Sequence, residues 1–214
     1  MIRRLVLTSL RLAIVGFGVA WVIDRVLGLR AGDSPPEPIR SLVVIDAPID
    51  RVWAVLADIE GQPRWMHEMK SVRVLTPGPV RVGTRGEATV RVFGMATTDP
   101  VTVTEFEPPT RFAIDHEGSF TGGGVITLEP GADGTTTIVR WDETLIAPAL
   151  RHVAATAMAP VLGRIFQADL FRLRDIVEAE RVAGEARTIG DAGRPPGDAG
   201  AGTTLEDLPA SSTI

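Results

Sequence analysis

The chain has 214 residues, which is enough for one domain with a sizeable core and short appendages but not for two full domains. Its formal net charge is −5, from 22 basic and 27 acidic residues, and no segment carries a basic stripe, so we expect no nucleic-acid partner. The absence of cysteine excludes disulfides, thiolate metal sites and a cysteine nucleophile, and the absence of tyrosine leaves no phenol to act as a general acid.

Composition divides the chain into four segments. Residues 1–30 are apolar and basic, and residues 31–38 (AGDSPPEP) form a proline-rich linker. Residues 39–181 alternate like a globular domain, whereas residues 182–214 are rich in Gly, Ala, Pro, Asp and Ser and are expected to be disordered. A single lysine beside many arginines, with abundant alanine and glycine, indicates a GC-rich bacterial genome.

The N-terminal segment predicts a membrane anchor, with three other interpretations open. The apolar run Leu5–Ile23 approaches the length of about 20 residues that a spanning helix needs, although Arg11 interrupts it. A cleaved signal peptide would use residues 18–20 (GVA) as its cleavage site, but the apolar run continues beyond them. An interfacial helix would place Arg4, Arg11 and Arg25 on one stripe, and a soluble helix is the fourth interpretation.

The central segment contains seven stretches that alternate apolar and polar residues or are rich in β-branched residues, as strands do. Turn-like sequences separate them, among them Pro77-Gly78-Pro79, Pro108-Pro109 and Asp133-Gly134. We therefore predict an antiparallel meander with strands at residues 41–46, 71–75, 86–93, 101–106, 111–116, 124–129 and 136–143.

Two helical patterns interrupt the strands. The first begins at Pro48 and carries an apolar side as far as Ile59. The second runs from about Pro148 to Arg181, and Pro160 should kink it or split it in two.

The order of these elements resembles the START-like, helix-grip superfamily called SRPBCC, which includes polyketide cyclase/dehydrase proteins, lipid-transfer proteins and the major birch pollen allergen. The resemblance is carried by residues 47–75 (APIDRVWAVLADIEGQPRWMHEMKSVRVL), 125–144 (VITLEPGADGTTTIVRWDET) and 170–180 (LFRLRDIVEAE). It implies an α+β fold in which a curved seven-stranded antiparallel sheet wraps around a long C-terminal helix. A short helix pair would follow the first strand, and the N-terminal helix would be an addition.

The resemblance also implies an apolar cavity between sheet and long helix. By the family pattern, Trp65 in the turning sequence DIEGQPRWMHEM belongs to a short helix that closes one end of the sheet; stacking on a ligand is the alternative. Strand parity and the helical period predict one enclosed space of roughly a few hundred Å³, while a solid core is the alternative. The predicted lining residues are Val101, Val103, Phe112, Ile114, Ile126, Leu128, Val139, Trp141, Met158, Leu162, Ile165 and Phe166, with Ala157 on the same helix as a position for filling the space.

Two polar residues share the inward parity, namely His116 and Glu143. Their strands should have one strand between them, which places the two side chains about 10 Å apart at one rim, where a ligand headgroup can bridge them. The alternative is that both side chains lie at solvent-exposed ends of their strands and have no functional role. The glycines at 122–124 favour sheet curvature or a close backbone approach. No HExxH or similar spacing occurs, so neither a metal nor a cofactor is expected.

Three classes of function fit this sequence. The leading hypothesis is a protein that binds or transfers an apolar, lipid-like or polyketide-like molecule near a membrane, because the expected cavity offers few catalytic groups. The second is a polyketide cyclase or dehydratase, with His116 and Glu143 as the candidate catalytic residues. The third is an interaction module without a small ligand.

Overall fold

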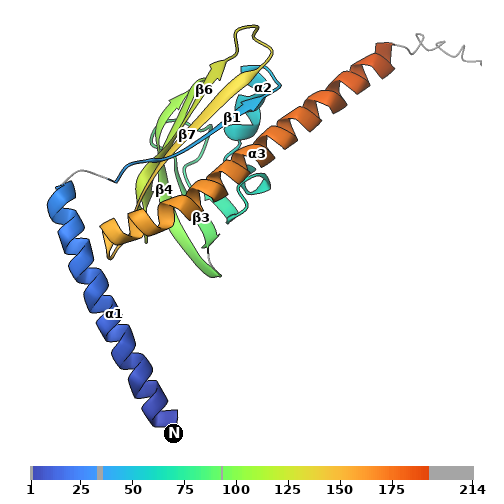
Figure 1. The fold of residues 1–214 in the computed structure, drawn as a ribbon. Helices are drawn as coiled ribbons and strands as arrows, with labels where there is room; N and C mark the ends of the chain where they lie inside the picture. Colours follow the sequence, from blue (N-terminus) through green and yellow to red (C-terminus); the bar gives the residue numbers. More distant parts are fainter. Residues whose placement is uncertain (1, 33–35, 93, 193–214) are drawn as a thin grey trace, which may run out of the picture. The chain divides into compact units, whose positions relative to one another are not determined.

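The structure is a computed structural model, which describes residues 2–32, 36–92 and 94–192. In chain order its elements are α1 (Ile2–Ala31), β1 (Ile39–Ile45), α2 (Ile49–Leu56), the 3-10 turn η1 (Gln62–Arg64), β2 (Met69–Val74), β3 (Arg85–Val92), β4 (Met95–Glu107), β5 (Arg111–Glu117), β6 (Thr121–Pro130), β7 (Thr137–Ile146) and α3 (Arg151–Ala192) (Figure 1). All seven predicted strands are present. The expected disorder of residues 193–214 lies outside the described residues.

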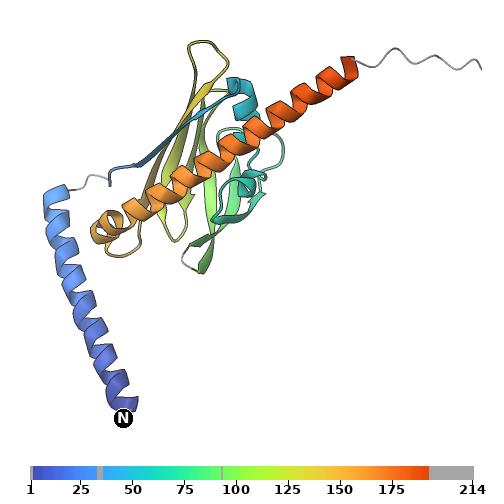
Figure 2. The same cartoon turned by 45° about the vertical axis from the view of Figure 1, so that its right-hand side comes forward.

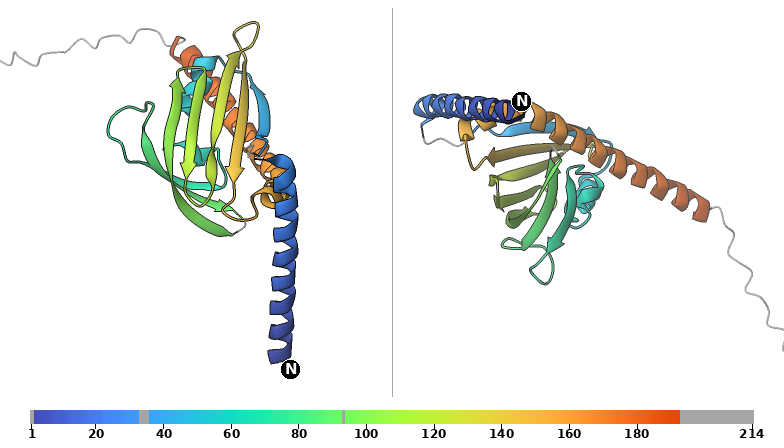
Figure 3. Two further views of the ribbon diagram at one scale, coloured as in Figure 1. Left: turned by 90° about the vertical axis from the view of Figure 1, so that its left-hand side faces the viewer. Right: turned by 90° about the horizontal axis from the view of Figure 1, so that it is seen from below.

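The strands form one antiparallel sheet in the order β1-β7-β6-β5-β4-β3-β2. Helix α3 crosses one face of this sheet in every view (Figures 2 and 3). Its residues Leu170, Leu173 and Val177 are buried in the same core cluster as Val139 and Ile126 of the sheet. This arrangement confirms the predicted α+β helix-grip fold, because one apolar stripe of a helix covers the apolar face of a curved sheet.

Helix α3 is longer than the sequence pattern predicts. It starts after Leu150, whose positive φ of 51° turns the chain into the helix, and it runs through Pro160 without being split. It also continues past Arg181 to Ala192, although composition predicts disorder from residue 182 onward. Alanine, glutamate and arginine in that stretch are strong helix formers, so local propensity outweighs its low apolar content.

Trp65 is an aromatic residue in a turning segment, and its burial explains why it is there. Its side chain is 0% exposed, and its ring lies edge-on to Trp141 with the centroids 6.1 Å apart. The segment is held in place because the backbone N–H of Trp65 donates to the carbonyl of Gln62, and that of His67 donates to Asp169 Oδ1 on α3 at 3.0 Å. The ring therefore closes the core at this end of the sheet, as the resemblance implies.

Helix α1 is apolar and unusually exposed. An 18-residue window within Arg4–Ala31 has a mean hydropathy of 2.0, and none of it is buried inside the protein. Among the described residues, α1 is the one helix long and apolar enough to cross a membrane. Near its end, Asp24 Oδ1 accepts hydrogen bonds from the backbone N–H groups of His152 and Val153, at 2.8 and 3.0 Å, and so caps the first turn of α3.

Candidate functional site

One pocket among the described residues, here called the β2–β5 pocket, has a volume of about 70 Å³ and a mainly apolar wall. Alternate residues of β2, β3, β4 and β5 form this wall, and Ile59, Gln62 and Met69 close it on the other side. Four of the predicted lining residues are part of it, namely Val101, Val103, Phe112 and Ile114, and His116 ends the row.

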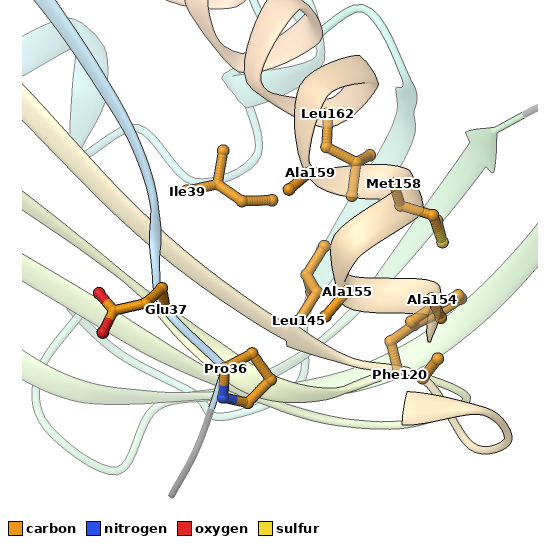
Figure 4. A pocket seen from close by; sticks show the side chains of 11 residues that line it. Pro36, Glu37, Ile39, Phe120, Leu145, Ala154, Ala155, Met158, Ala159 and Leu162 are labelled. Carbon is orange, nitrogen blue, oxygen red and sulfur yellow. The ribbon is translucent and has the colours of Figure 1, made fainter. Parts of the chain in front are cut away.

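The smaller pocket, here called the linker pocket, has a volume of about 30 Å³. Pro36 and Glu37 of the linker contribute to it, together with Ile39 at the start of β1. Met158 and Leu162, two of the predicted lining residues, reach it from α3, and Figure 4 shows how these side chains gather around one space.

The prediction of one enclosed space of a few hundred Å³ is wrong, because side chains fill the middle of the grip. The rings of Trp141 and Phe166 pack with their centroids 4.7 Å apart. Ile126, Leu128 and Val139 are also buried core residues, and Ile165 is partly exposed. That these six side chains contact a ligand stays a prediction. Ala157 is exposed on α3 and lines neither of these two pockets, so it is not the filling position that the helical period suggests.

His116 and Glu143 form a pair at the end of the β2–β5 pocket. His116 Nε2 lies 2.8 Å from Glu143 Oε1, and the other carboxylate oxygen accepts a hydrogen bond of 2.8 Å from Trp141 Nε1. The Glu143 side chain is only 4% exposed, whereas that of His116 is 24% exposed and borders the pocket. A buried carboxylate thus orients an imidazole that borders the pocket.

The expected separation of about 10 Å between these two side chains is wrong. Strand β6 does lie between β5 and β7, but its residue opposite both Ile114 and Glu143 is Gly124. A Cβ at Gly124 would approach Glu143 Oε2 to 2.2 Å, so a side chain there would occupy the place of the carboxylate. The missing side chain lets Glu143 lean across β6 to reach His116, so Gly124 serves a close approach, one of the two roles that the sequence suggests for these glycines.

Electrostatics favour the protonated form of His116. Burial by itself lowers the pKa of His116, but the hydrogen bond and the charge of Glu143 outweigh burial, and Asp115 and Asp99 add to them, so the pKa is raised above 6.5. The imidazole is therefore a proton donor to the pocket over a wider pH range than an exposed histidine would be.

The globular part of the chain matches a known family over nearly its whole length. The family model described as "Polyketide cyclase / dehydrase and lipid transport" matches residues 39–178. The chain belongs to this family. No curated protein matches the chain.

Solved structures with this fold include an aromatase/cyclase. The Zhui aromatase/cyclase from Streptomyces sp. R1128 is 20% identical with a TM-score of 0.54, over 66% of this chain and 93% of that one. The protein TTHA0849 from Thermus thermophilus is 21% identical with a TM-score of 0.55, over 67% and 98% of the two chains. At these identities the likeness concerns the fold.

In this member of the polyketide cyclase/dehydrase family, the wall of the β2–β5 pocket includes residues that were not predicted from the sequence. Val72, Ala88 and Val90 line the β2–β5 pocket from β2 and β3. Strand parity marks them in the same way as the residues of β4 and β5, so the signal was present. Gln62 and Met69 lie outside regular alternation, and no pattern in the sequence marks them.

The charge on His116 should depend on its partner. Replacing Glu143 by glutamine should lower the pKa of His116, because burial then acts without the hydrogen bond to the Glu143 carboxylate and without its charge. Nuclear magnetic resonance titration of the imidazole signals measures this pKa, and His67 and His152 are the other two histidines. Asp142→Asn is the matched control, since Asp142 is the next residue on β7 and is exposed.

The sign of the pH effect on stability follows from the raised pKa. The pair stabilises the folded state fully below the unfolded pKa of about 6.5, and this contribution is lost as pH rises through the raised pKa. Unfolding free energies of the parent and of Glu143→Gln should therefore differ most at acidic pH and converge above the raised pKa. An unchanged titration of His116 in Glu143→Gln would contradict the assigned pair.

Proposed function

We propose that this domain binds an apolar small molecule in the β2–β5 pocket, with a polar group of the ligand placed against His116. The carrying observation is a mainly apolar pocket whose few polar groups include an imidazole that a buried carboxylate orients at 2.8 Å; Asp99 and Arg85 are also part of the wall. Apolar walls with a few placed polar groups are typical of small-molecule sites. The family match supports the class of ligand, because its description names polyketide chemistry and lipid transport.

The pocket must open to admit such a ligand. A volume of about 70 Å³ is smaller than the roughly 300 Å³ at which ligand pockets begin. Part of its wall is made by Ile59 and Gln62 of the connecting segment and by Met69 at the first position of β2. Burial of Trp65 and the hydrogen bond to Asp169 hold the segment itself, whereas methionine adapts its shape to a neighbour. A ligand therefore enlarges the pocket by displacing side chains of this wall, that of Met69 first.

We also propose that α1 anchors the domain in a membrane. Its apolar residues are exposed around the whole helix, which is costly in water but favourable in a bilayer. Arg25 lies over the ring of Trp21 at 5.4 Å, and this aromatic and basic pair stands at the end of the apolar run, as at a membrane interface. The bound ligand would then be exchanged close to the bilayer.

A second candidate function is acid–base catalysis of the cyclase or dehydratase type. The observation that favours it is the raised pKa of His116, since a carboxylate-backed imidazolium can donate a proton to a carbonyl or hydroxyl group and take it back. His116→Ala separates the two functions. A binding protein keeps its affinity for a purely apolar ligand in this variant, whereas an enzyme loses turnover.

Filling the pocket tests the binding function. Val72→Trp should weaken binding of N-phenyl-1-naphthylamine, an apolar dye that fluoresces in dry sites, by at least about tenfold, because the indole occupies the cavity. Ser71→Trp is the matched control, since Ser71 is the preceding residue on β2 and is exposed. Dye titration of the chain in detergent, with the signal of the dye in detergent alone subtracted, measures both affinities, and circular dichroism confirms folding. Equal affinities for the two variants would exclude the β2–β5 pocket as the site.

A further inference from the structure

The linker pocket lies where the domain joins the N-terminal helix. Pro36 and Glu37 of its wall belong to the end of the linker, and Ala155 and Ala159 come from the first turns of α3 (Figure 4). The pocket is small, at about 30 Å³, and its lining residues other than Glu37 have apolar side chains, although polar atoms contribute nearly half of the accessible lining. Its place in the chain, rather than its size, distinguishes it from the β2–β5 pocket.

Chain length ties this pocket to α1. Helix α1 ends at Ala31, so five peptide units separate its last residue from Pro36. At no more than about 3.6 Å for each residue, the two ends cannot be further apart than about 18 Å. This limit depends only on covalent geometry, so the linker pocket stays near the end of α1 in every conformation of the linker.

A second contact ties the first turn of α3 to the same end of α1. Asp24, which caps the backbone N–H groups of His152 and Val153, is the first charged residue after the apolar run Leu5–Ile23. If α1 spans a bilayer, a carboxylate at this point lies at the interface with water. The N-terminus of α3, which forms one wall of the pocket, then lies at the interface as well.

Two residues of the linker pocket are neighbours of Glu143 in the sheet. Ile39 is the register partner of Glu143 between β1 and β7, and Leu145 is two residues further along the same face of β7. Both Ile39 and Leu145 line the linker pocket, while His116 lines the β2–β5 pocket. The hydrogen-bonded pair His116–Glu143 therefore adjoins residues of the linker pocket through Glu143 and borders the β2–β5 pocket through His116.

We propose that the linker pocket is the membrane-facing entrance of the ligand site, and that its occupant is the apolar end of a ligand leaving the bilayer. The ligand passes from the bilayer between the linker and the start of α3, and its polar group meets His116 as it reaches the β2–β5 pocket. This inference rests on the proposed function, because it requires both an apolar ligand and an anchored α1. To the proposed function it adds the route by which the ligand enters. This route determines the rate at which the domain is loaded from a membrane but not its equilibrium affinity for the ligand.

The test compares loading from a membrane with binding at equilibrium. The full chain carrying Trp21→Phe is placed in phosphatidylcholine vesicles and mixed with vesicles that contain N-phenyl-1-naphthylamine. Energy transfer from Trp53, Trp65 and Trp141, the remaining tryptophans, which all lie in the core or pack against it, reports arrival of the dye in the domain. The same chain in detergent gives the equilibrium affinity for the dye.

Ala159→Phe and Ala155→Phe each fill the linker pocket, and Ala157→Phe is the matched control, because it makes the same change on an exposed side of the same helix. Both filling variants should slow loading from vesicles at least about tenfold while changing the affinity in detergent less than about twofold. The control variant should change neither. Two independent positions guard against one variant failing to fold, which circular dichroism detects.

The outcomes separate this inference from the proposed function. If the parent chain in detergent does not bind the dye, the proposed function fails and the entrance fails with it. If the parent binds but both filling variants load at the rate of the control, the proposed function stands and the entrance is elsewhere. If the filling variants lose affinity in detergent as well, the linker pocket is part of the binding site and not its entrance.

Discussion

Replacing Trp65 with alanine should lower the free energy of unfolding by about 3–5 kcal/mol, the usual cost of removing a large buried aromatic ring. The ring is 0% exposed and belongs to the core cluster that includes Trp141 and Leu170. Its removal leaves a void under the segment that connects α2 to β2, which is short and cannot easily collapse into it. Urea unfolding of the chain from Pro36 onward, followed by circular dichroism, measures the loss.

Two control variants make the Trp65 experiment specific. Trp65→Phe should cost much less than the alanine variant, because the indole nitrogen has no hydrogen-bond partner among the described residues and phenylalanine retains most of the apolar volume. Phe171→Ala should cost less than about 1 kcal/mol, since that ring is 44% exposed. A loss below about 1 kcal/mol for Trp65→Ala would show that the ring is not part of the core.

Strand positions were predictable because the local signal is strong. Alternation over five to eight residues with turn residues between the runs marked each strand, but β4 was predicted much too short, since Pro100 reads as a break. Pro100 in fact lies inside β4, paired with Glu87 of β3. Residues 95–99 were therefore missed from the strand. The predicted antiparallel meander holds for β2 to β7, but it is wrong for β1, which pairs with β7 at the sheet edge and not with β2.

The site was harder to predict because it depends on packing across the sheet. Strand parity correctly predicted that His116 and Glu143 face the inner side of the sheet. It does not predict whether a side chain of the strand between them separates the two. Because Gly124 has no side chain, Glu143 of β7 reaches across β6 and forms a hydrogen bond with His116 of β5. Likewise, parity marks which side chains face α3 but not whether they meet. The packing of Trp141 against Phe166 shows that the centre of the space between the sheet and α3 is filled.

Removing residues 1–35 should move the protein from the membrane fraction to the soluble fraction while the remaining domain stays folded. The full chain should resist extraction by high salt and by alkaline carbonate and be released only by detergent, as expected for a spanning helix. The domain loses only the Asp24 cap of α3 among the hydrogen bonds described here between α1 and the rest of the chain. Loss of a cap costs about 1 kcal/mol, which leaves the fold intact.

Point variants in α1 separate spanning from the other interpretations of this segment. Ile14 and Val15 are each 63% exposed in the middle of the apolar run. Changing both to aspartate should release the full chain, because each aspartate at the centre of a span costs about 2.5–3.5 kcal/mol to insert, whereas leucine at both positions should change nothing. Extraction of the parent chain by carbonate would instead favour a helix lying in the interface. A mature N-terminus directly after Ala20, found by mass spectrometry, would identify a signal peptide. The domain would then lose the tether that places the linker pocket at a membrane.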